Sequence, residues 1–339
     1  MQMIYHNYFV TMKGFMEKPY ISIILRLVVS GLLLFFLFRL SRMENISVVF
    51  QRIDPTYLLA YYFLFILGIS LQVLRWKYLL NAWDIQQGFG TLLQWSLMGL
   101  FLNNFLPGGV GGDAFRLYAG SRITGRLQDF AATIFYERIL SYSSLIVLGL
   151  GSLIIRANYS EDRLFWLLLG FIFLCLIGVF AFLTLPGFAV LVNKIIDRYP
   201  LMQKLRLKNW LESFRFKVKH PAMLIGVFFF SFLIQFIEVF SFRLVANAIQ
   251  IPVQLTDLFL FVPLLYLAVL LPFSINGMGI REMIFLFFAS QWGISQPEAV
   301  AFSLTVFTLT LAGSLIGGPV YWIERKQWTH HQQHADYSK

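Results

Sequence analysis

The amino-acid sequence predicts an all-α polytopic membrane protein with six full spans and two re-entrant hairpins of broken helices. Apolar residues (Ala, Val, Ile, Leu, Met, Phe, Trp, Tyr and Cys) make up 58% of the 339 residues and charged residues only 13%. Soluble domains reach only about 45–50% apolar residues even when glycine is counted. The apolar residues also gather in long runs, which is typical of helices whose solvent is lipid.

Six apolar runs are long enough to cross a bilayer as helices, which takes about 20 residues. We expect the first run to be a span and not a signal peptide, because it is too long and no small-residue cleavage site follows it. The six predicted spans cover residues 20–40, 55–74, 131–155, 164–185, 222–246 and 299–323.

Two further apolar regions are interrupted by proline and glycine, at 107–112 and at 272–279. Each interruption separates two apolar segments that are too short to span alone. Open backbone is not tolerated against lipid, so we expect each break to be buried in protein or to line a cavity. The sequence therefore predicts two hairpins of half-helices, one at 91–106 with 113–126 and one at 257–271 with 280–292.

Positive charge predicts the orientation of the chain. The loop 186–220 carries eight Lys and Arg residues against two acidic residues, and such loops stay in the cytoplasm. Counting spans from this loop puts both termini in the cytoplasm. It makes the first hairpin, flanked by Arg75, open to the inside and the second hairpin open to the outside.

The chain is accordingly predicted to be a single integral domain of the cell membrane, residues 1–339, with two inverted halves. The halves cover about 20–155 and 222–323, and the span 164–185 and the basic loop join them. Aligning the prolines that open the two breaks also aligns Gly112 with Gly277 and Arg116 with Arg281.

Interrupted helices at corresponding positions of two halves are a sequence pointer to a transporter site near the middle of the membrane. The second half-helix of each pair begins with unpartnered N–H groups and a positive dipole end, which suits an anion such as a phosphodiester. The alternative is that both breaks are bends in a passive bundle. The residues expected to bind a lipid head group are Asn104, Pro107, Gly108, Gly109, Gly111, Gly112, Asp113, Arg116, Ser274, Asn276, Gly277, Gly279, Arg281 and Glu282.

Acidic neighbours leave a second interpretation of the two arginines open. Asp113 lies one turn before Arg116, and Glu282 is adjacent to Arg281, so these carboxylates are candidates for local neutralisation. Asp113 is also a candidate helix cap.

Two glutamates, Glu137 and Glu238, lie inside predicted spans, where we expect them to relay protons or to balance the arginines. Arg138 and Arg243 are expected to lie near the interface. We predict no catalytic residue, cofactor or metal site, because the histidines fall outside the spans and the glycine patterns lack a preceding strand. The net charge of +10 is expected to face anionic lipid heads rather than nucleic acid.

The run from Asn103 to Arg116 and the later run from Pro272 to Glu282 resemble the lysylphosphatidylglycerol synthase transmembrane-region family. The second run departs from the usual pattern at Asn276, where glycine is more usual. The family includes the flippase part of multiple peptide resistance factor and many stand-alone bacterial and archaeal membrane proteins. The resemblance covers most of the chain and implies movement of a lipid or support of lipid-linked glycosylation. No soluble aminoacyl-transferase domain is recognisable in the sequence, so we expect no synthase activity.

The sequence thus predicts a flippase-like transporter of membrane lipids in which Arg116 and Arg281 hold a phosphate from opposite halves. Two alternatives stay open. One is an accessory protein that scaffolds a lipid-modifying enzyme such as a glycosyltransferase. The other is an intramembrane transferase that uses Asp113, Glu137 or Glu238 as a base.

Overall fold

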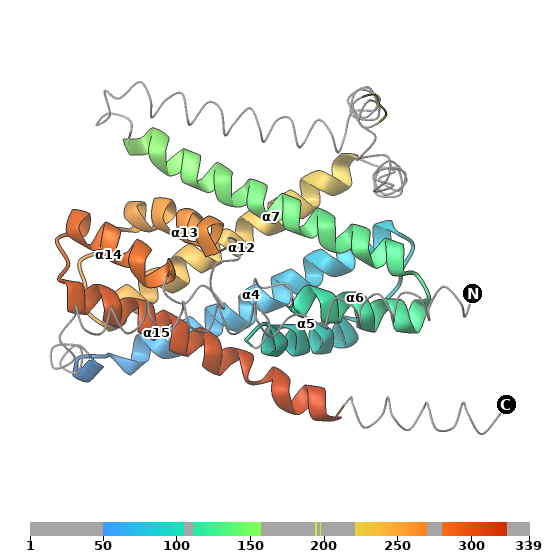
Figure 1. Cartoon of the computed structure of the whole chain (residues 1–339), viewed down its shortest axis with the longest axis horizontal. Helices are drawn as coiled ribbons and strands as arrows, with labels where there is room; N and C mark the ends of the chain where they lie inside the picture. Colours follow the sequence, from blue (N-terminus) through green and yellow to red (C-terminus); the bar gives the residue numbers. More distant parts are fainter. Residues whose placement is uncertain are drawn as a thin grey trace.

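A computed structural model of the chain describes residues 50–104, 111–156, 221–269 and 280–323, with the isolated positions 194 and 197. Within these residues the chain is helical, with short connections and no strand. Figure 1 shows long helices crossing the molecule side by side, with shorter helices at the two ends of the bundle. The all-α prediction is therefore confirmed for the part of the chain that the structure describes.

Four helical segments are long and apolar enough to cross a membrane. They correspond to four of the six predicted spans. The other two predicted spans, 20–40 and 164–185, lie outside the described residues, as does the loop 186–220 apart from two positions. The four segments are α4 (Pro55–Ala82), Leu127–Ile154 within α7 (Leu127–Arg156), Met223–Ala248 within α12 (Pro221–Ala248) and Gln296–Ile323, which begins with α15 (Gln296–Ser314).

Helix α4 begins at a standard cap and ends later than predicted. The Asp54 side chain accepts a hydrogen bond from the Thr56 N–H at 2.9 Å, with proline in the first turn. The helix then runs to Ala82 instead of ending near residue 74. Trp76 and Leu80 are fully buried in this extension, so packing carries the helix past the end of its apolar run. The extension places Arg75 inside the bundle.

Two pairs of short helices occupy the places where hairpins were predicted: α5 (Phe89–Asn103) with α6 (Gly111–Thr124), and α13 (Leu255–Val269) with α14 (Ile280–Trp292). Each helix has 13 to 15 residues. At 1.5 Å per residue that is only about 20 Å, short of the roughly 30 Å of a bilayer core. The pairs lie at opposite ends of the bundle (Figure 1). The connecting breaks, 105–110 and 270–279, lie outside the described residues.

Helices α5 and α6 meet with their backbones in contact. A Cβ atom on Gly112 would lie 2.8 Å from the carbonyl oxygen of Gly99, which is too close for any side chain. The Asn103 side chain accepts a hydrogen bond from the Gly112 N–H at 2.6 Å. The first N–H groups of a helix have no partner within it, so this bond caps α6 and fixes it against α5.

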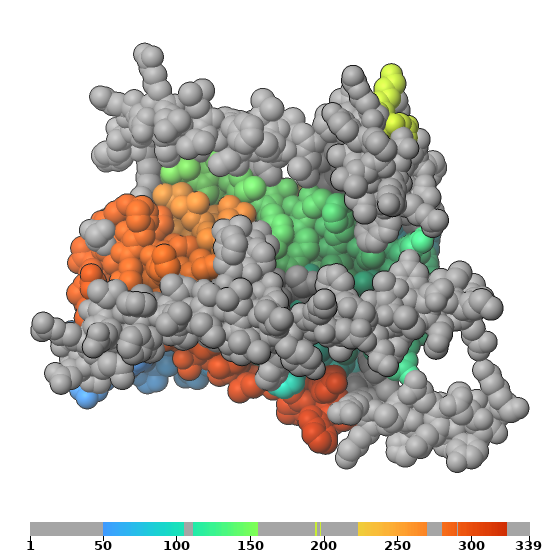
Figure 2. All heavy atoms as spheres, in the orientation of Figure 1, coloured from blue at the N-terminus to red at the C-terminus, as the bar shows by residue number. Residues whose placement is uncertain are grey.

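Large apolar side chains cover much of the outside of the bundle. Leu59, Phe63 and Ile66 lie on one face of α4 and are all more than half exposed. Figure 2 shows α13 (orange) beside α7 (green) on one face of the molecule. An apolar exterior of this kind suits a protein surrounded by lipid.

Within the described residues, buried apolar side chains form two clusters, one around each short pair. The first cluster gathers Trp76, Trp95 and Phe130 near α5 and α6. The second gathers rings such as Phe261 and Phe285, whose centroids lie 4.4 Å apart, near α13 and α14. The polar residues described next come from helices of both clusters.

Candidate functional site

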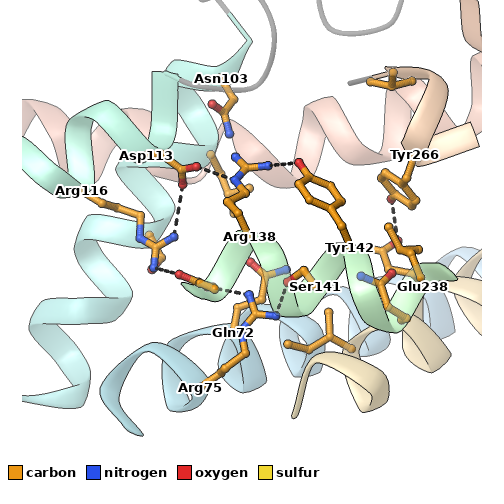
Figure 3. A pocket seen from close by; sticks show the side chains of 17 residues that line it. Gln72, Arg75, Asn103, Asp113, Arg116, Arg138, Ser141, Tyr142, Glu238 and Tyr266 are labelled. Carbon is orange, nitrogen blue, oxygen red and sulfur yellow. Dashed lines mark hydrogen bonds and ion pairs between the residues drawn. The ribbon is translucent and has the colours of Figure 1, made fainter. Parts of the chain in front are cut away.

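A polar cavity of about 300 Å³ lies among six helices, α4, α5, α6, α7, α12 and α13. Its volume is at the lower end of the range for small-ligand sites. Figure 3 shows its side chains converging from these helices. Six of the lining residues are charged: Arg75, Asp113, Arg116, Glu137, Arg138 and Glu238.

One buried carboxylate, that of Glu137 on α7, joins two arginines. Its Oε1 atom lies 2.6 Å from Nη2 of Arg75 on α4, and its Oε2 atom lies 2.6 Å from Nη2 of Arg116 on α6. All three side chains are largely buried. A carboxylate between two guanidinium groups stays ionised and accepts charge-assisted hydrogen bonds from both. Glu137 therefore holds α4, α6 and α7 together.

A second carboxylate, that of Asp113 at the start of α6, extends this arrangement. Its Oδ2 atom lies 2.6 Å from Nε of Arg138, and its Oδ1 atom lies 3.4 Å from Nη1 of Arg116. Arg138 also donates a hydrogen bond to the Tyr142 hydroxyl at 2.9 Å. The series Arg75–Glu137–Arg116–Asp113–Arg138 forms a continuous charge network (Figure 3), with three arginines and two carboxylates.

The three arginines of the charge network all line the cavity but differ in how exposed their side chains are. Arg75 donates to the Ser141 and Ser231 hydroxyls at 2.6 and 2.9 Å, and its side chain is only 6% exposed. The Arg116 guanidinium lies 3.9 Å from the ring centroid of Trp76, which stacks a cation on an aromatic face, and is 13% exposed. The Arg138 side chain is 40% exposed. Arg138 is therefore the arginine best placed to meet a ligand.

The third lining carboxylate, Glu238 on α12, stands apart from the charge network. Its Oε2 atom accepts a hydrogen bond from the Tyr266 hydroxyl of α13 at 3.0 Å. Among the described residues it forms no ion pair within 4.0 Å. Arg281 of α14 is close enough to act on Glu238 and Tyr266 electrostatically. The cavity thus has two sides. The arginine side holds the charge network, and the Glu238 side holds Glu238 and Tyr266.

The predicted residues in the first hairpin fall into two groups. Asp113 and Arg116 line the cavity, whereas Gly111 and Gly112 are buried at the start of α6. Asn104 donates to the Ser314 hydroxyl at 2.7 Å and so ties α5 to α15, and it is not among the lining residues. The predictions at Pro107, Gly108 and Gly109 lie outside the described residues.

The predicted residues of the second hairpin are farther from the cavity. Arg281 is not among the lining residues, and its guanidinium lies 6.0 Å from the Phe307 ring centroid. No acceptor among the described residues reaches its buried Nε atom. Glu282 accepts a hydrogen bond from the Ser303 hydroxyl at 2.9 Å. Four predicted residues lie outside the described part of the chain: Ser274, Asn276, Gly277 and Gly279.

Sequence reasoning did not assign Arg75, Arg138, Tyr142 and Tyr266 to the site. It also missed smaller polar residues of the lining, which include Gln72, Ser96, Ser141 and Gln235. Arg75 was expected at the cytoplasmic flank and Arg138 near the interface. The usable signal was Glu137, because a carboxylate inside a membrane helix requires cationic or hydrogen-bonding partners. Arg243, also expected near the interface, instead donates to the Val253 carbonyl and anchors the connection between α12 and α13.

Comparison with known proteins also covers residues outside the described part of the chain. A family model, described as the lysylphosphatidylglycerol synthase TM region, matches residues 23–318. A UPF0104 membrane protein of Methanothermobacter thermautotrophicus is 22% identical over 200 residues, which cover 57% of this chain and 55% of that protein. A second one from the same organism is 25% identical over 280 residues, covering 76% of this chain and 82% of that protein.

A UPF0104 membrane protein of Methanocaldococcus jannaschii is 28% identical over 130 residues. That match covers 36% of this chain and 39% of the relative. The chain thus spans about half the length of the first Methanothermobacter relative and less of the Methanocaldococcus one. All three relatives are described as membrane proteins.

Proposed function

This chain belongs to the lysylphosphatidylglycerol synthase transmembrane-region family, and from this premise we propose that it is a flippase-like lipid transporter. In this proposal it acts in the cell membrane and carries a phospholipid or lipid-linked head group through the polar cavity. The lipid tails stay in the bilayer while the head group crosses. Both termini face the cytoplasm, and the two hairpins belong to inverted halves of one membrane domain.

The charged cavity is the observation that carries the proposal. Six charged side chains inside a bundle of apolar helices cost more free energy to bury than apolar side chains would. Such groups in membrane proteins mark ion and substrate pathways. Three of the six are arginines, whose planar forks match phosphate oxygens. A lipid phosphate is the ligand that combines this chemistry with access from the membrane.

The charge network supplies a way for ligand binding to move helices. Asp113 and Glu137 each bridge two arginines, so a phosphate that takes Arg138 competes directly with Asp113. Asp113 begins α6, and Arg138 lies on α7. Exchanging one anion for another here would remove one of the two ion-pair links between α6 and α7, and the Arg116–Glu137 pair would remain as the other. Two alternative pairings of this kind are what a two-state transporter requires.

Reconstitution of the purified full chain into vesicles tests the proposal. Phospholipids labelled with a fluorophore on an acyl chain are bleached by dithionite only in the outer leaflet, so loss of the protected fraction measures movement of the head group. We expect faster loss than in empty vesicles, and about tenfold slower movement with Arg138→Gln. The matched control is Arg122→Gln, which changes an arginine on α6 outside the cavity lining.

Movement at the empty-vesicle rate by well-folded protein would overturn the transporter proposal. Co-purification of a lipid-modifying glycosyltransferase in that case would favour the accessory role. Equal rates for the Arg138 variant and the unmodified protein would remove the cavity from the transport route.

A further inference from the structure

We propose that the cavity selects zwitterionic head groups, with a phosphate on the arginine side and an ammonium on the Glu238 side. Phosphoethanolamine is the simplest head group of this class. This inference rests on the proposed function for the source of the ligand. It goes further by assigning the substrate class and by giving Glu238 a role in recognition.

The lining charges balance overall but are unevenly placed. The cavity is lined by three arginines and three carboxylates. The charge network holds all three arginines but only two of the carboxylates, which leaves one positive charge in excess. The remaining negative charge is Glu238. A cavity with separated charges of opposite sign complements a head group that is itself a dipole.

Glu238 has the surroundings that an ammonium group favours. Its Oε2 atom accepts from Tyr266, and none of the described residues donates to its Oε1 atom. Tyr142 lines the same cavity, so a second aromatic ring is available in it besides Tyr266. Carboxylates bind cations by charge-assisted hydrogen bonds, and aromatic faces add a further attraction. The carboxylate can therefore accept hydrogen bonds from a new donor without losing the one it already has.

Tyr142 joins the two sides of the cavity. Its hydroxyl accepts a hydrogen bond from Arg138, one turn earlier on α7. Figure 3 shows Glu238 and Tyr266 beyond Tyr142, on the side away from Asp113 and Arg116. Phosphate and ammonium groups joined by a short linker would bind to the two sides of this tyrosine, with the phosphate at Arg138 and the ammonium at Glu238.

Arg281 provides a competing explanation for Glu238. This arginine acts on Glu238 electrostatically, although the two form no ion pair within 4.0 Å in the described residues. If Glu238 only balanced Arg281, its removal would disturb the cavity for every lipid alike. If Glu238 binds an ammonium, its removal affects only head groups that carry one. The comparison between head groups therefore separates the two roles.

Binding to the full chain in detergent, measured by native mass spectrometry, tests the assignment without requiring transport. The probes are phosphoethanolamine and phosphoglycerol lipids with identical acyl chains. We expect the unmodified protein to bind the phosphoethanolamine lipid more tightly. Glu238→Gln should weaken that binding about tenfold and leave phosphoglycerol binding unchanged. Arg138→Gln should weaken both.

The matched control is Glu298→Gln, which also replaces a carboxylate by an amide. Glu298 lies in the capping box at the start of α15, outside the cavity lining, and glutamine supports the same capping box. We expect this variant to bind both lipids as the unmodified protein does. Competition with soluble O-phosphoethanolamine then distinguishes a free zwitterion from a lipid-borne one. If soluble O-phosphoethanolamine displaces the lipid in a Glu238-dependent way, the cavity binds the zwitterion as a free ligand. If the lipid stays bound, the cavity binds the zwitterion as part of a membrane lipid.

Equal weakening of both lipids by Glu238→Gln, or tighter binding of phosphoglycerol by the unmodified protein, would overturn the inference. Vesicle assays with both lipids test transport separately from head-group selectivity. Selective binding without movement would leave the zwitterion assignment standing and reject transport. Movement of both lipids, with no effect of Glu238 on binding or rate, would do the reverse.

Discussion

The Oε2 atom of Glu137 on α7 lies 2.6 Å from the Nη2 atom of Arg116 on α6, and both side chains are withdrawn from the surface. The other oxygen of the same carboxylate holds Arg75 on α4. One side chain of α7 therefore connects this helix to both α4 and α6. This makes Glu137 part of the architecture of the cavity as well as part of its charge.

Replacing this carboxylate should destabilise the protein strongly. Glu137→Gln leaves Arg75 buried without its counter-charge and leaves Arg116 with Asp113 alone. Breaking a buried ion pair from one side costs about 3–5 kcal/mol. The measurement is thermal unfolding in detergent, where we expect a large fall in Tm. Glu298→Gln, at an exposed cap, should leave Tm nearly unchanged. A Glu137 variant as stable as that control would mean that the arginines do not need this carboxylate.

The contact between α5 and α6 yields a second stability prediction. A Cβ atom on Gly112 would lie 2.8 Å from the Gly99 carbonyl oxygen, so Gly112→Ala should push the helices apart and cost about 1–3 kcal/mol. Gly90→Ala on the same helix pair adds a Cβ atom with nothing within 4 Å. We expect this control to be neutral or slightly stabilising. Equal Tm values for the two variants in detergent would contradict the close approach.

Much of the architecture follows from local sequence. Four predicted spans and both short pairs agree with the structure because bilayer thickness sets the length of an apolar run and because proline and glycine interrupt helices. The end of α4 could not be predicted from the local sequence. Arg75 looks like a terminal charge in sequence, but burial of Trp76 and Leu80 against other helices extends α4 beyond it.

The site could be predicted only in part, because its geometry depends on contacts between distant segments. The sequence identified Asp113, Arg116 and Glu137 as ionisable groups inside the membrane. It could not assign Arg75 to Glu137, which lies 62 residues away in the chain. The exposure of Arg138 is likewise a result of how α6 packs on α7. Local pattern locates charges, whereas packing decides which charges meet.

Asn103 should prove necessary for the start of α6. Its side chain accepts the Gly112 N–H at 2.6 Å, and loss of such a cap costs about 1 kcal/mol. In Asn103→Ala we therefore expect faster amide hydrogen exchange in the first turn of α6, with little change in α12. Asn103→Asp keeps an acceptor and should restore slow exchange. Fast exchange in both variants would show that the amide group, and not its acceptor oxygen, matters.

Arg75 is more deeply buried than Arg138. We therefore expect substitution of Arg75 to lower mainly stability and substitution of Arg138 to slow mainly lipid movement. Arg75 is 6% exposed and donates to three side chains, so Arg75→Gln should cost about 3 kcal/mol or more in stability. Arg138 is 40% exposed, so Arg138→Gln should cost less than about 1 kcal/mol, because solvent screens its ion pair. The Arg138 variant should nevertheless move lipid about tenfold more slowly, because the guanidinium that it lacks lines the cavity. The measurements are Tm in detergent and lipid movement in vesicles, made on both variants. An Arg138→Gln variant that unfolds at as low a temperature as Arg75→Gln would contradict the prediction.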